Sequence, residues 1–111
     1  MNTFDERERG FERKFALDQE VAFKVVARRN ALLARWAAAR MGFSGSRMDA
    51  YVKTLVESQI AHDGAESIAT RVMSDLVANG VPISRGEIDA RIARFTGRAR
   101  AEIVRSSLRQ S

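Results

Sequence analysis

This sequence contains few side chains that could catalyse a reaction. The chain has no Cys, and its one His, His62, stands beside Asp63 at a predicted helix end. A lone His in that position is more typical of a surface or capping residue than of a catalyst. The residues that build a zinc site are missing, as are the Gly-rich loops that hold phosphates or dinucleotides. We therefore expect a protein that is not an enzyme and needs no metal or cofactor.

Aromatic side chains stand among charged residues at the start of the chain. Phe4, Phe11 and Phe15 are separated by seven and then four residues, so a helix would place them on one face. If the helix continues, Phe23 lies near that same face. An apolar face of this kind, flanked by charges, is typical of a helix that binds in a groove of a partner protein.

Whether this first segment forms an ordered helix depends on the balance between the free energy of burying its Phe side chains and the entropy cost of fixing its backbone. Full burial of three Phe side chains could contribute roughly 5–9 kcal/mol, whereas ordering the backbone costs about 1–2 kcal/mol per residue. Gly10 adds a cost of about 1 kcal/mol relative to Ala. We expect residues 3–18 to be mobile or partly helical when free and ordered when bound. The alternative, in which the segment folds back and packs its rings on the protein's own core, stays open.

A second feature is a series of Arg residues near the end of the chain. Arg91, Arg94 and Arg98 follow helical spacing, and Arg105 lies two turns further on. Such a face could hold phosphates, which makes nucleic-acid binding the alternative function. It could equally be a solvated helix face supported by Glu87. Because the middle of the chain is acidic, with 3 basic and 5 acidic residues between 43 and 84, we expect no nucleic-acid partner.

Four helical segments would position these residues. Apolar residues recur at intervals of three and four through the regions 3–41, 46–60, 63–78 and 84–105, and no region alternates with a period of two. Each of the four helical segments begins with two residues, three positions apart, that resemble a capping box. These residue pairs are Thr3 with Glu6, Ser46 with Asp49, Asp63 with Glu66, and Ser84 with Glu87. Gly42 and Gly80 are typical helix ends, and Ser106 to Ser111 are predicted to be frayed.

The predicted fold class is all-α. Short connections favour antiparallel helix neighbours, so we expect a small four-helix bundle domain over residues 19–111. It is preceded by the mobile or partly helical segment of residues 1–18. The predicted core includes Trp36 as a packing residue, together with the other residues of the four helical stripes: Ala22, Val25, Val26, Leu32, Leu33, Ala37, Met41, Met48, Tyr51, Val52, Leu55, Val56, Gln59, Ile60, Ile68, Val72, Met73, Leu76, Ile88, Ile92, Phe95, Ala99 and Ile103.

Length and composition restrict the class of protein. A chain of 111 residues with 45% hydrophobic and 30% charged residues fits one domain with a modest core. No apolar run is long enough to cross a membrane, and the first residues lack the order of a secretory signal. With no Cys, a soluble protein of the reducing cytoplasm is expected.

The N-terminal third resembles a known family. The stretch from Thr3 to Ala16, TFDERERGFERKFA, is similar to the opening of the zeta inhibitor subunit of alphaproteobacterial F-type ATP synthases. The resemblance continues in short matches, first Phe23-Lys24, Ala27-Arg28-Arg29-Asn30, Leu32-Leu33 and Trp36-Ala37-Ala38, then more sparsely Gly42 with Ser44-Gly45, Asp75-Leu76 and Gly80-Val81.

The resemblance implies a function and a location. The protein would bind the catalytic head of the synthase, made of the alpha, beta and gamma subunits, on the cytoplasmic face of the membrane and without inserting into it. Its N-terminal segment would form a helix between a catalytic and a non-catalytic subunit and arrest rotation in the hydrolytic direction. The partner-binding positions carried over are Thr3, Phe4, Asp5, Glu6, Arg7, Glu8, Arg9, Gly10, Phe11, Glu12, Lys14 and Phe15.

Two positions depart from the family pattern. Leu17 stands where the family commonly has a His, so any contribution of that His to pH sensing would be absent from this chain. Ala34 replaces a Gly beside the Leu-Leu run, which should stiffen the first bundle helix. Neither departure changes the Phe spacing.

Overall fold

Helices make up the described part of the chain. The computed structural model describes residues 3–60 and 65–110, and side chains within 18–57 and 67–109. The helices are α1 (Thr3–Arg40), α2 (Gly45–Ile60), α3 (Ala65–Ala78) and α4 (Arg85–Gln110). No strand occurs within the two described ranges. The prediction of an all-α protein with four helices is confirmed.

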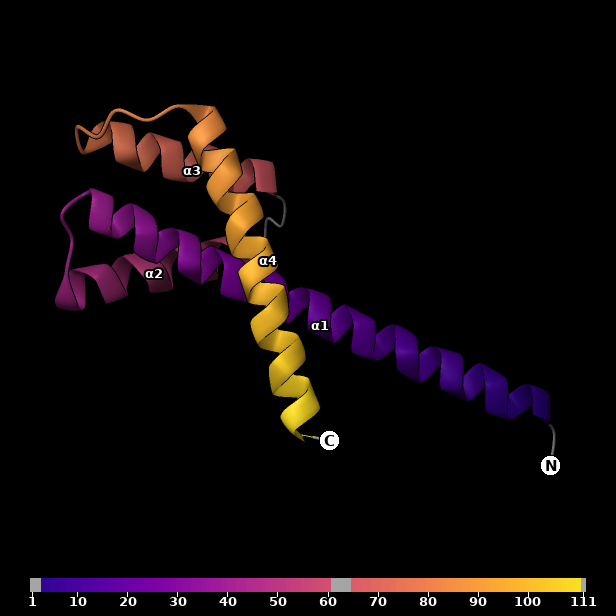
Figure 1. Cartoon of the computed structure of the whole chain (residues 1–111). Helices are drawn as coiled ribbons and strands as arrows, with labels where there is room; N and C mark the ends of the chain where they lie inside the picture. Colours follow the sequence, from indigo (N-terminus) through magenta and orange to yellow (C-terminus); the bar gives the residue numbers. More distant parts are fainter. Residues whose placement is uncertain (1–2, 61–64, 111) are drawn as a thin grey trace.

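The long helix α1 is the centre of the arrangement. Its second half contacts α2, α3 and α4, while its first half extends beyond the other three helices (Figure 1). The molecule measures 65 × 25 × 22 Å, and its radius of gyration of 17.6 Å exceeds the roughly 13 Å of a compact chain of this length. The 38 residues of α1, at about 1.5 Å per residue, account for most of the long dimension.

One hydrophobic core joins the four helices. The largest fully buried side chains are Leu33 of α1, Leu55 of α2, Ile68, Val72 and Leu76 of α3, and Ile88 of α4. All six were predicted from the helical spacing of apolar residues. Burial of each side chain contributes roughly 1.5–3 kcal/mol, so these contacts hold the helices together. The prediction was wrong at Ala22, which is exposed because it precedes the first buried residue in the described part of α1, Val25.

Helices α1 and α3 are each followed by a Gly in the left-handed conformation, in agreement with the predicted helix ends. Gly42, with φ of 81°, and Gly80, with φ of 77°, take the left-handed conformation. The next residues bond back into each helix: Phe43 N–H donates to Ala38 O at 2.8 Å, and Val81 N–H donates to Leu76 O at 2.9 Å. These bonds satisfy carbonyls that a helix end would otherwise leave without partners.

The helix starts agree with the predictions only in part. At α4 the Glu87 N–H donates to the Ser84 Oγ at 3.1 Å, as predicted. The predicted start of α2 was wrong, because the helix begins at Gly45 and not after Ser46. Gly45, with φ of 56°, turns the chain into the helix, so Ser46 already lies in the first turn. The predicted caps at Thr3 and Asp63 lie outside the described side chains.

The end of α4 also differs from the prediction. The helix continues to Gln110 and does not fray from Ser106. The sequence after Gly97 contains neither Gly nor Pro to stop a helix. Residues 104–109 are all exposed, so this end of α4 stands clear of the core.

Candidate partner-binding surface

The candidate binding residues lie on the first turns of α1. The backbone from Thr3 to Phe15 is helical and spans about 20 Å. A helical backbone is what the spacing of Phe4, Phe11 and Phe15 requires if the three positions are to share a face. The side chains of residues 3–17 lie outside the described part of the structure, so their roles stay predictions.

The next residues connect this segment to the bundle. Residues 18–20 and 22–24 are exposed, and Phe23 keeps 56% of its surface accessible. Glu20 and Lys24 form an ion pair of 3.2 Å along the helix. Packing against the core begins with Val21, and Val25 is buried. An exposed Phe directly outside the core leaves an apolar group available to a partner.

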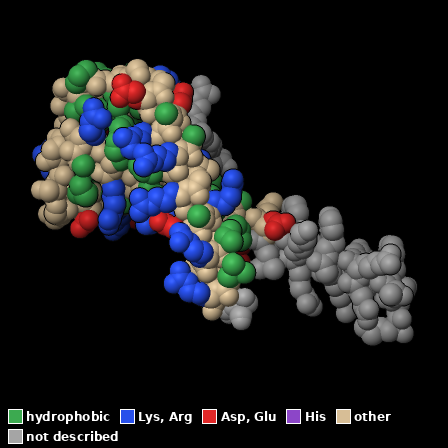
Figure 2. Space-filling model, in the orientation of Figure 1, with side chains coloured by type: hydrophobic (Ala, Val, Ile, Leu, Met, Phe, Trp, Pro, Cys, Tyr) green, Lys and Arg blue, Asp and Glu red, His purple; other side chains and the backbone are tan. Residues whose placement is uncertain are grey.

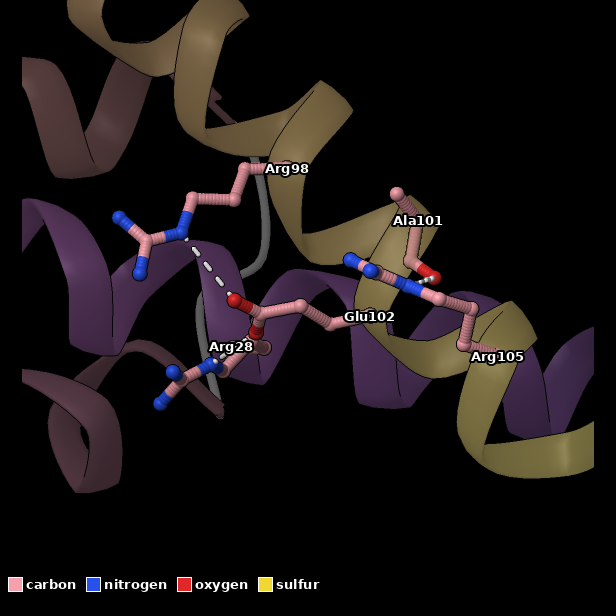
Figure 3. A network of polar contacts seen from close by, with 5 residues as sticks. All are labelled: Arg28, Arg98, Ala101, Glu102 and Arg105. Atoms are coloured by element: carbon pink, nitrogen blue, oxygen red, sulfur yellow. Dashed lines mark hydrogen bonds and ion pairs between the residues drawn. The ribbon is translucent and has the colours of Figure 1, made fainter. Parts of the chain in front are cut away.

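A carboxylate fixes α1 to α4 (Figure 3). Glu102 accepts from Arg28 Nε at 2.7 Å and from Arg98 Nε at 3.1 Å. Arg28 and Glu102 are 74 residues apart in the sequence, so the pair joins two helices, whereas Arg98 lies one turn away on α4. The hydrogen bonds from Arg28 and Arg98 lower the pKa of Glu102. In Figure 1, α4 crosses α1 near the point where α1 leaves the other helices.

A second contact between these helices surrounds Trp36. The Arg91 guanidinium lies 5.2 Å from the ring centroid, and that of Arg40 lies 5.6 Å from it. The ring also packs against the core, which agrees with the predicted packing role. Arg91 thus stacks on an aromatic ring and is not ion-paired with Glu87, the support predicted for it. Each such cation–π contact contributes about 0.5–1 kcal/mol at an exposed site.

Two buried polar residues of α1 were missed at the sequence level. Asn30 is 3% exposed and Arg29 is 8% exposed. The Arg29 Nε donates to the Asn30 Oδ1 at 3.0 Å, and burial lowers the pKa of Arg29. Polar residue types predict exposure, and the only sequence signal for this pair was its place in the stretch that resembles the zeta family.

A polar contact also joins α2 to α3. The Tyr51 hydroxyl donates to Asp75 Oδ2 at 2.8 Å, and Arg71 Nε donates to the same oxygen at 3.0 Å. Burial, reinforced by the hydrogen bond to Asp75, raises the pKa of Tyr51. The contact fixes the α2–α3 pair and lies away from the first half of α1.

The described part of the chain holds neither a metal-ligating cluster nor a membrane-spanning helix. No cluster of three or more His, Cys, Asp or Glu side chains there could hold a metal ion. None of the described helices is long and apolar enough to span a membrane. His62, the one catalytic candidate considered from sequence, lies outside the described residues.

Comparison with known families agrees with this arrangement. The sequence model of a family described as ATPase inhibitor subunit zeta matches residues 1–102. The match includes α1, α2, α3 and most of α4, and therefore every candidate binding residue. No curated protein matches the chain. The resemblance seen in the N-terminal third is thus confirmed over most of the sequence.

Proposed function

The chain belongs to the ATPase inhibitor subunit zeta family, and from this premise we propose that it inhibits ATP hydrolysis by inserting the first half of α1 into the catalytic head. Membership of this family makes the protein a regulator of an F-type ATP synthase and not an enzyme. The insertion, the subunits contacted and the residues that contact them are the proposal.

The shape of α1 is the observation that supports insertion. The helix runs without a break from Thr3 to Arg40, and its first half extends beyond the other helices (Figure 1). The stretch that carries the Phe pattern is therefore presented away from the bundle. A single helix about 10 Å wide fits a cleft between two subunits better than the whole bundle does.

The proposed mechanism is a wedge. The helix would lie between a catalytic and a non-catalytic subunit, with Phe4, Phe11 and Phe15 in apolar pockets and the charged residues between them paired with charges of the cleft. Rotation requires this interface to open and close in turn. A helix held there would stop that cycle in the hydrolytic direction and spare ATP when the proton gradient collapses.

The bundle would give the wedge its orientation. The Arg28–Glu102 pair of 2.7 Å and the Trp36 contacts fix the second half of α1 on α4. Because α1 is continuous, a bundle that rests against the outside of the head would set the direction in which the first half points. The protein would then act on the cytoplasmic face of the membrane, where the head lies.

Hydrolysis by soluble catalytic heads tests the proposal. We expect full-length protein to inhibit, and the F4A/F11A/F15A variant to inhibit at least tenfold less strongly, because buried aromatic anchors dominate interfaces. A matched control is Val77→Ala, which shortens a side chain that is 57% exposed on α3 and should leave inhibition unchanged. Absence of inhibition by the full-length protein, with heads from the same organism, would remove the proposal.

Truncation separates the wedge from the bundle. Protein lacking residues 1–14 should remain folded and lose inhibition. A truncated form that inhibits as well as the full chain would place the active surface elsewhere.

Backbone relaxation of residues 3–18, measured with and without heads, would test whether the segment is mobile when free and ordered when bound.

A further inference from the structure

The C-terminal part of α4 extends beyond the described core of the protein. Beyond Ile103, which packs against the core, every residue from 104 to 109 is exposed. Val104 and Leu108 keep 45% and 69% of their surfaces accessible. In Figure 1 this end of α4 passes α1 and continues away from the other helices.

A row of Arg side chains runs along one side of α4. We call it the arginine stripe, and it consists of Arg91, Arg94, Arg98, Arg105 and Arg109. Their spacing of three, four, seven and four residues keeps them on one side of a helix over about 27 Å. Figure 2 shows Lys and Arg side chains gathered along the visible face of α4 down to its C-terminal end.

The stripe carries more positive charge than the described carboxylates neutralise. Arg98 shares Glu102 with Arg28, and Arg91 stacks on Trp36. Among the described residues, Arg105 donates to the Ala101 carbonyl of its own helix, at 3.3 Å, and pairs with no carboxylate (Figure 3).

Two further members of the stripe add to this surplus. Among the described residues, no carboxylate lies within ion-pair distance of Arg94 or Arg109. Arg94, Arg105 and Arg109 therefore present three guanidinium groups to whatever lies beside α4.

We infer that the arginine stripe docks on a carboxylate-bearing protein surface of the catalytic head and forms a second contact beside the inserted helix. This inference rests on the proposed function and names the bundle surface that would face the same partner. Glu102 lies at the contact between α1 and α4, and Arg109 follows it by seven residues, or about 10 Å. A partner that holds the exposed part of α1 would therefore lie within reach of the stripe.

A protein surface fits the stripe better than a nucleic acid does, because an exposed apolar side chain, Leu108, lies next to Arg109. A guanidinium can bind a carboxylate through two parallel hydrogen bonds, and Leu108 adds an apolar contact of the kind that protein interfaces use. The apolar face of α4 that could enter a lipid surface is buried in the core, with Ile88 and Ala99 fully inaccessible.

Binding of fluorescently labelled full-length protein to soluble heads tests the inference. The R94Q/R105Q/R109Q variant removes the three charges that have no carboxylate partner among the described side chains. We expect binding about tenfold weaker at low salt, and a difference that shrinks as salt rises, because salt screens exposed charges. The control variant R47Q/K53Q/R100Q removes the same charge from other surfaces and should bind within twofold of wild type. Circular dichroism verifies that both remain folded.

The outcomes separate this inference from the proposed function. If wild type binds and inhibits but the stripe variant binds equally well at low salt, the second contact is wrong and the wedge stands. If the stripe variant binds weakly while F4A/F11A/F15A inhibits like wild type, the stripe is supported and the wedge is not. A wild type that does not bind heads overturns both.

Other partners of the stripe are also tested. Tighter binding of wild type to a duplex oligonucleotide or to anionic vesicles than to heads, lost in the stripe variant, would overturn the inference. Self-association through the stripe at the working concentration would do the same.

Discussion

At the level of single residues, Glu102 is the most connected side chain of the surface between α1 and α4. One of its partners, Arg98, lies four residues before it, a spacing at which ion pairs form within any helix. The other, Arg28, is 74 residues away, and only the packing of α1 on α4 brings it close. Local spacing could have suggested the first partner but not the second.

The pH dependence of stability should reveal this pairing. Because the pKa of Glu102 is lower in the folded protein, its ionised form stabilises the fold above the unfolded-state pKa of about 4.3. That contribution is lost as pH falls through the folded-state pKa. Glu102→Gln should therefore be less stable than wild type at pH 7, and the difference should disappear only once the pH has fallen below the lowered folded-state pKa of Glu102. Urea unfolding across this range measures the difference, and a gap that did not change with pH would contradict the assignment.

Tyr51 provides a second test at the residue scale. Tyr51→Phe removes the hydrogen bond to Asp75 but leaves Asp75 paired with Arg71, so we expect a loss of about 1 kcal/mol in the free energy of unfolding. Since burial raises the pKa of Tyr51, the unfolded chain ionises first. The advantage of wild type should then shrink above about pH 10. An equal loss at pH 7 and pH 11 would show that the hydroxyl is not held protonated in the fold.

At the level of elements, helix ends were among the features best predicted from sequence. Gly42 and Gly80 were predicted as helix ends because only Gly enters the left-handed conformation without strain, and the structure shows both there. The start of α2 was misplaced because Gly45 and Ser46 are both plausible first residues.

Two Gly→Ala variants should have opposite effects. Gly80→Ala places a side chain at φ of 77°, and we expect a loss of roughly 1–2 kcal/mol in unfolding free energy. Gly97→Ala, in the middle of α4, meets no atom within 4 Å and should gain about 0.5–1 kcal/mol through helix propensity. Denaturant titration of both variants measures the two changes. A stable Gly80→Ala protein would mean that this turn can rearrange without cost.

At the level of the whole molecule, the protein is a small bundle on the second half of one long helix. The first half of α1 adds length without adding to the described core, which begins with Val21 and Val25. This division would let one part bind a cleft while the other part keeps a stable fold.

Deleting residues 1–18 tests the division. We expect an unfolding free energy within about 0.5 kcal/mol of wild type, as for changes away from a core. Leu33→Ala, at a fully buried position, should in contrast cost about 2–5 kcal/mol. If the deletion were as costly as Leu33→Ala, the first segment would pack on the bundle, the alternative that the sequence left open.

What the sequence determined by itself is local. Apolar residues at helical spacing predicted four helices and their core faces, Gly positions predicted two helix ends, and the stretch from Thr3 to Ala16 predicted the family. Tertiary structure decided the rest: the pairing of Arg28 with Glu102, the stacking of Arg91 on Trp36, and the burial of Arg29 and Asn30. Each of these depends on which helices surround α1, and helix packing is set by contacts between residues far apart in the chain.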